Sequence, residues 1–144
     1  MAIEVVYNLI TGSPPVAAPL DNANCHAEGA GLAAGVVIKV DASGAAGATG
    51  KAAIANVTGA DAVGVTIAAA DQDALVRFKW LKPGDVLKAA AAAELQVGDT
   101  CQFNATLDGF DDGTGTTVKV IRTEKDADGD HKVVYGVLTA AAFY

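Results

Sequence analysis

Side chains that could carry out chemistry are few in this chain and widely spaced. The candidate thiols are Cys25 and Cys101, and the candidate imidazoles are His26 and His131. A cysteine nucleophile needs a histidine held across a structured pocket, whereas His26 simply follows Cys25 in a proline- and glycine-rich segment. The four residues contain no ligand pair at the spacing of a zinc site. We therefore expect free thiols in a reducing compartment, and a bridge between Cys25 and Cys101 stays open.

Two aspartate-rich segments, residues 108–115 and 126–130, invite comparison with calcium-binding loops. An EF-hand loop has its glycine sixth and a glutamate twelfth, but counting from Asp126 the glycine is fourth and the twelfth residue is Val137. Asp-Gly is instead a strong signal for a hairpin turn. We predict a turn at residues 126–130, a solvated loop at 108–115, and neither metal nor cofactor.

Two further catalytic motifs fail on their context. The segment GAAGATGK at residues 44–51 looks like a phosphate-binding loop, but no Ser or Thr follows Lys51, and the flanking pattern favours strands. Neither Ser13 nor Ser43 stands in a nucleophile elbow. With no catalytic residues to name, the sequence predicts that the protein is not an enzyme.

Charge and hydropathy exclude two classes of partner. The net charge of −7 and the pI of about 4.5 disfavour nonspecific binding to nucleic acid, since the basic residues are interleaved with acids and form no separate face. No stretch reaches the roughly 18 to 20 apolar residues that cross a bilayer, and the N-terminus lacks the pattern of a signal peptide. We expect no nucleic-acid partner and no membrane.

The elements that would have to position any site are short strands. Alternation is clearest in residues 74–80, where Val76, Phe78 and Trp80 share one face. The remaining strands are expected at residues 35–41, 52–57, 62–69, 98–107, 117–123 and 131–144, with a turn at 81–85 and at most one short helix at 87–95. This spacing predicts a mainly β fold, a small β-barrel, with a jelly-roll β-sandwich as the alternative.

The first 34 residues have a different composition. Residues 3–10, IEVVYNLI, predict a short strand, and three of the four prolines follow it. Proline removes amide donors, which argues against a paired central strand in this segment. We predict an extended N-terminal arm over residues 1–34 and a single β domain over residues 35–144.

One stretch, DAVGVTIAAADQDALVRFKW at residues 61–80, resembles the central part of phage head-decoration proteins of the lambda type. Those proteins carry a similar Ala-Val-Gly-apolar strand, an Ala-Ala-Asp-Gln turn and a following alternating strand. The resemblance covers about residues 35–90, and the loop at 107–115 and the long C-terminal hairpin depart from it. The matching positions are Ala62, Val63, Gly64, Val65, Ala69, Ala70, Asp71 and Gln72.

The resemblance implies a β-tulip-like barrel that sits on the outer surface of a phage capsid as a homotrimer, with a dimer as the alternative. It implies a structural virion protein, made in the host cytoplasm, that stabilises the shell by bridging neighbouring major capsid proteins. We expect the arm to add a strand to a sheet edge on a neighbouring subunit. The predicted capsid-binding residues are Ile3, Val5, Tyr7, Ile10, Pro14 and Pro15.

A second function stays open, that of a β-sandwich module that binds carbohydrate or a host surface. Such a module needs an exposed aromatic platform, for which Trp80, Phe103 and Phe110 are the candidates.

The C-terminal strand is apolar on both faces, which favours cover by a second layer or a partner subunit. Its apolar residues are Val133, Tyr135, Val137 and Phe143 on one face and Val134, Leu138 and Tyr144 on the other.

Overall fold

The computed structural model describes residues 2–8, 17–19, 26–27, 31–41, 51–55, 59, 61–71, 76–113 and 117–139, and every regular element in these ranges is a β-strand. The predicted mainly β class is therefore confirmed. The strands are β1 (Glu4–Asn8), β2 (Ala17–Pro19), β3 (His26–Ala27), β4 (Val37–Asp41), β5 (Lys51–Ile54), β6 (Gly64–Thr66), β7 (Arg77–Trp80), β8 (Asp85–Ala90), β9 (Thr100–Phe103), β10 (Phe110–Asp111), β11 (Val118–Glu124) and β12 (Val133–Leu138).

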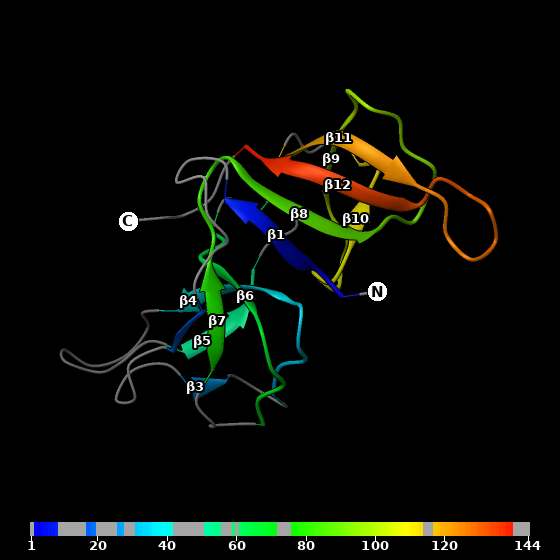
Figure 1. Ribbon diagram of the computed structural model, residues 1–144. Helices are drawn as coiled ribbons and strands as arrows, with labels where there is room; N and C mark the ends of the chain where they lie inside the picture. Colours follow the sequence, from blue (N-terminus) through cyan, green and yellow to red (C-terminus); the bar gives the residue numbers. More distant parts are fainter. Residues whose placement is uncertain are drawn as a thin grey trace.

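The first of two sheets is antiparallel and strongly curled, with the strand order β1-β8-β12-β11-β9-β10 (Figure 1). The curl brings the last strand, β10, back to the chain that follows β8. There, Ala91 and Phe110 form an isolated bridge, and the amide of Ala92 donates to the carbonyl of Phe110 at 3.1 Å. The sheet is thus a half-barrel in which the edge strand β10 is bonded to the segment that follows β8. The strand β1 forms the opposite edge.

The second sheet is smaller and lies below the first in Figure 1, with the order β2-β7-β6-β4-β5-β3. Its neighbouring strands are antiparallel, except that β3 runs parallel to β5. The register pairs Val65 of β6 with Val37 of β4 on one side and with Lys79 of β7 on the other. Four strands from one stretch of the chain, residues 37–80, therefore make the centre of this sheet.

Two clusters of buried side chains fill the molecule. The larger one lies inside the half-barrel, around Phe103, Phe110 and Leu87, and it also contains Val37 and Val65 from the second sheet. The smaller one gathers Ile38, Val63, Val76 and Phe78, with Leu32 and Ala70, and Trp80 packs against it. In β4, Val37 enters the larger cluster and Ile38 the smaller one, so apolar residues on both faces of this strand are buried.

Alternating burial explains most of the strands that the sequence predicts. In β7 the side chain of Phe78 is fully buried and that of Arg77 is exposed; in β11 the side chains of Val118 and Val120 are buried and Lys119 is exposed. The turn expected at residues 81–85 is present, and it is closed by a 2.9 Å hydrogen bond from the amide of Lys82 to the Asp85 carboxylate.

The short helix expected at residues 87–95 is not formed. Residues 85–90 are instead β8, which pairs with β1 on one side and β12 on the other. Leu87 and Ala89 are buried in the half-barrel while Lys88 between them faces outward. The helical preference of alanine is a fraction of a kcal/mol per residue, so two ladders of strand hydrogen bonds and a buried face outweigh it.

The expected N-terminal arm also differs from the structure over residues 2–8. This segment contains β1, which pairs antiparallel with β8 of the same chain, with a bulge at Val6. Ile3 and Val5 are only 4% and 6% exposed and belong to the larger core cluster. The boundary predicted at residue 34 therefore does not separate β1 from the domain. The proline-rich residues 9–16 and 20–25 lie outside the described ranges, and an arm there stays a prediction.

Cys101, on β9, is a core residue rather than a reactive thiol. Its side chain is fully buried, and burial, followed by the nearby charge of Asp99, raises the pKa of the thiol from 9.0 to about 12. A thiolate, which is the reactive form, is therefore disfavoured at this position. Cys25 lies outside the described residues.

The burial of β1 predicts a clear contrast between two substitutions on that segment. Ile3→Ala removes buried methylene groups and should lower the free energy of unfolding by about 2–4 kcal/mol. Val6→Ala, at a side chain that is 37% exposed, should cost less than about 1 kcal/mol. Urea unfolding followed by circular dichroism measures both. Equal losses would show that residues 2–8 are not part of the core.

The raised pKa of Cys101 predicts a pH-dependent stability. Above about pH 9 the thiol ionises in the unfolded chain but stays protonated in the folded one, so the folded state binds more protons and its stability falls as pH rises toward 12. Between pH 8 and pH 10 this loss amounts to about 1 kcal/mol. The free energy of unfolding of the wild type, measured relative to Cys101→Ala, should drop by that amount. A constant difference across these pH values would contradict the assignment.

Candidate functional site

The predicted capsid-binding residues do not form one surface in the described structure. Ile3 and Val5 face the protein's own core, and the backbone of Tyr7 pairs with Val86. Ile10, Pro14 and Pro15 lie outside the described residues. The strand that was expected to reach a neighbouring subunit is thus used, for residues 4–8, in the sheet of its own chain.

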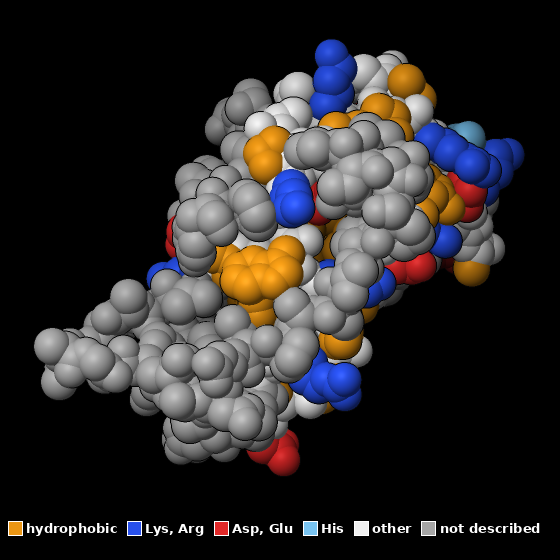
Figure 2. Space-filling view, turned by 60° about the vertical axis from the view of Figure 1, so that its left-hand side comes forward, with side chains coloured by type: hydrophobic (Ala, Val, Ile, Leu, Met, Phe, Trp, Pro, Cys, Tyr) orange, Lys and Arg blue, Asp and Glu red, His pale blue; other side chains and the backbone are white. Residues whose placement is uncertain are grey.

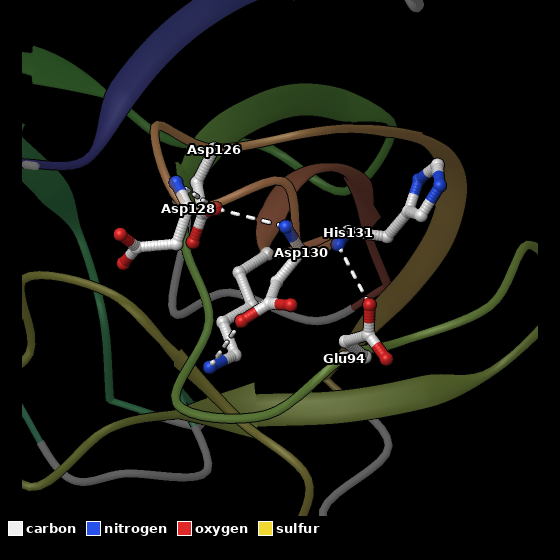
Figure 3. A network of polar contacts seen from close by, with 6 residues as sticks. Glu94, Asp126, Asp128, Asp130 and His131 are labelled. Atoms are coloured by element: carbon white, nitrogen blue, oxygen red, sulfur yellow. Dashed lines mark hydrogen bonds and ion pairs between the residues drawn. The ribbon is translucent and has the colours of Figure 1, made fainter.

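The aspartate-rich segment at residues 126–130 is the predicted hairpin turn between β11 and β12 (Figure 3). The Asp126 carboxylate accepts hydrogen bonds from the amides of Asp128 at 2.9 Å and Asp130 at 3.0 Å, and Gly129 takes a φ of +87°. These bonds direct the carboxylate toward backbone donors of the turn. Among the residues that the structure describes, no group of three or more His, Cys, Asp or Glu side chains could hold a metal ion.

His131 stands at the end of that hairpin and holds it to the loop after β8. Its amide donates to the Glu94 carboxylate at 2.9 Å (Figure 3). Its ring Nδ1 lies 3.3 Å from the hydroxyl of Thr123. Lys132 lies 3.3 Å from the Asp130 carboxylate. His131 is exposed and Cys101 is buried, so the structure does not bring this thiol and imidazole together.

Two carboxylates elsewhere have shifted pKa values with structural causes. Hydrogen bonds from Thr106 at 2.6 Å and Asn104 at 2.8 Å lower the pKa of Asp108 and fix the loop between β9 and β10. Burial raises the pKa of Asp85, whose Oδ1 has no hydrogen-bond partner among the described residues while its other oxygen closes the turn before β8. The Asp85 carboxylate thus caps a backbone amide, whereas the Asp108 carboxylate joins two side chains of its own loop.

The aromatic residues proposed as a platform pack inside the molecule. Phe103 and Phe110 are fully buried, with ring centroids 6.1 Å apart. Trp80 is half-buried and meets Phe78 edge-on at a centroid distance of 4.6 Å. Tyr135 is half-exposed on the outer face of the half-barrel, but Lys88 and Arg122 lie over its ring at 5.4 and 5.1 Å. These rings serve packing and cross-strand contacts.

Long-range folding also creates a hollow of about 350 Å³ between the two sheets. We call it the seam groove; it is lined by residues 2–5, 34–35 and 65–67 and by Lys79. Figure 2 shows a group of hydrophobic side chains at the height where the two sheets meet. Ile67, at the groove, is 37% exposed.

Close backbone packing at Gly35 builds the seam groove. The amide of Ile3 donates to the carbonyl of Gly35 at 3.0 Å, and the amide of Gly35 donates to the carbonyl of Thr66 at 2.8 Å. A Cβ at Gly35 would lie 2.2 Å from the Cβ of Ala2, and its φ of +73° also favours glycine. The Thr66 hydroxyl donates to the carbonyl of Ala33 at 2.7 Å and accepts from the amide of Val36 at 3.0 Å.

The chemistry of the seam groove is that of a docking surface. It offers apolar side chains, the Lys79 ammonium group, the Glu4 carboxylate and the edge strand β1, rather than a set of converging acids, bases or nucleophiles. No ion pair joins Lys79 to any residue that the structure describes. Sequence reasoning missed this surface because its residues come from four separate stretches of the chain.

In the described part of the chain, no helix is long and apolar enough to cross a membrane.

Comparison with known proteins adds one finding about the fold. No protein-family model matches the chain, and no curated protein matches it. A solved structure does match: the head fiber gp8.5 N base of bacteriophage phi29, with a TM-score of 0.56 and 11% sequence identity. The match covers 86% of this chain and 93% of that chain. At this identity the likeness is one of fold, and it extends over most of both chains.

Proposed function

We propose that the chain is a structural virion protein that binds the outer surface of a phage capsid and stabilises the shell by bridging neighbouring copies of the major capsid protein. The observation that carries this proposal is the fold shared with a phage head-fibre base over 86% of the chain. The resemblance of residues 61–80 to lambda-type head-decoration proteins points independently to the same location. Neither observation depends on the other, because one is a fold and the other a short sequence motif.

The arrangement of the polar side chains agrees with a non-enzymatic role. Asp108 and Asp126 stabilise loops through hydrogen bonds to neighbouring residues, and Glu94 holds the β11–β12 hairpin. The seam groove, in contrast, combines an open strand edge, apolar side chains and an ammonium group, which are the elements of a protein contact. Capsid subunits are the partners that we assign to it.

The alternative function, a binding module for carbohydrate or a host surface, has less support. Its platform candidates Phe103 and Phe110 lie in the core, and Trp80 packs on Phe78. Tyr135 is flanked by two cations that lie over its ring. A sugar ring would have to displace those contacts before it could stack.

We also propose that the protein acts as a homotrimer, with a dimer as the alternative. The outer face of β12 supports self-association, because Tyr135 and Val137 are half-exposed on it while Val134 and Leu138 point into the core. The sequence predicted that both faces of this strand are covered. On the outer face, only Val133 is buried among the described residues.

Capsid binding is tested by co-sedimentation. Purified protein is added to capsids of the phage that encodes it, assembled without it, and both are centrifuged through a sucrose cushion. We expect saturable binding to intact shells and a higher temperature of shell disruption, because each bound copy links neighbouring subunits. Protein unfolded by prior heating is the control. Absence of the native protein from the capsid pellet at micromolar concentration would refute the function.

The oligomeric state is tested by native mass spectrometry. We expect a trimer, either free in solution or released from dissolved capsids after cross-linking. Tyr135→Ser and Val137→Ser, on the outer face of β12, should weaken the trimer, whereas Val97→Ser, at an exposed side chain in the loop between β8 and β9, should leave it intact. Monomers in both preparations would contradict the proposal.

A further inference from the structure

The edge of the first sheet formed by β1 is open in the described structure. The opposite edge, β10, is tied to Ala91 and Ala92, so the half-barrel offers one free edge rather than two. A free strand edge presents unpaired N–H and C=O groups and is a template for pairing with another chain. Here no described strand pairs with β1 on the side away from β8.

The seam groove runs beside this free edge. Residues 2–5 form one wall, and residues 65–67 with Lys79 form the other. The backbone of Ile3 is already bonded to Gly35, which closes the groove at the start of β1. A volume of about 350 Å³ is within the range of pockets that hold small ligands, so alternate side chains of an added strand have room there.

The side chains around the groove define what it accepts. Ile67 lines the groove, and Val6 follows the lining residues on β1. Each is 37% exposed, and they are two of the four exposed large apolar residues in the described structure. Lys79 is a half-buried ammonium group that pairs with no described carboxylate, in contrast to Lys39, which lies 4.0 Å from Asp61. Glu4 also lines the groove, on the wall that residues 2–5 form. A matching segment is therefore extended, carries apolar residues, and places one carboxylate at Lys79 and away from Glu4.

We infer that β1 and the seam groove accept an extended, carboxylate-bearing segment of the major capsid protein as an additional strand of the first sheet. The inference rests on the proposed function, since it names the contact through which the chain holds the shell. Main-chain hydrogen bonds to β1 supply affinity, and the ion pair with Lys79 fixes the register of the added strand. The chain therefore receives a strand at this edge, whereas the sequence predicted that it donates one.

A charge reversal with a matched control tests the ion pair. Lys79→Glu should weaken co-sedimentation with capsids by about tenfold or more, because a charge-assisted contact becomes a repulsion. Arg77→Glu makes the same change in charge on the same strand, at an exposed position outside the groove, and should change the affinity less than about twofold. Raising the salt concentration should reduce the difference in capsid affinity between the two variants. Thermal melts confirm that both variants fold.

Hydrogen–deuterium exchange tests the added strand with unmodified protein. Amides of residues 4–8 should exchange more slowly on the capsid than in free protein, while those of the β11–β12 turn should not change. Unchanged exchange in β1 on saturated capsids, or equal binding of the two variants, would overturn the inference and leave the proposed function standing. Failure of the wild-type protein to bind capsids would instead overturn the proposed function, and the inference with it.

Discussion

The joint at Gly35 is the contact on which the arrangement of the two sheets depends. Backbone hydrogen bonds there run from Ile3 to Gly35 and from Gly35 to Thr66, so one short turn connects the edge of the half-barrel to the second sheet. The backbones approach so closely that a methyl group would lie 2.2 Å from Ala2. Once this joint is formed, Val37 and Val65 enter the core of the half-barrel, and β1 is held against β8.

The same joint links stability to the proposed contact with the capsid. It anchors the N-terminal end of β1, buries Ile3 and Val5, and leaves the outer edge of that strand beside a groove. A rigid edge loses little conformational freedom when a partner strand is added. Most of the conformational entropy lost on binding is therefore lost by the partner segment. A contact of this kind suits the proposed role of the chain as a capsid-binding protein.

Local patterns in the sequence predicted the elements that depend on interactions between residues close together in the chain. Alternation at Val76 and Phe78 predicted β7, and the Asp-Gly turn at residues 126–130 predicted the hairpin. Long-range pairing decided the rest. Residues 85–90 are a strand because β1 and β12 flank them, and residues 4–8 join the sheet of their own chain because β8 offers them a pairing edge. The seam groove unites residues that are up to 77 positions apart, such as Ala2 and Lys79, and no local motif marks it.

Electron cryomicroscopy of capsids saturated with the protein is the most direct measurement of whether the chain is a capsid-binding structural protein. The account predicts density for the chain on the outer surface of the shell, with β1 and the seam groove turned toward the capsid and a strand of the shell protein continuing the half-barrel sheet. Shells without such density, or with the chain attached so that β1 faces solvent, would contradict it.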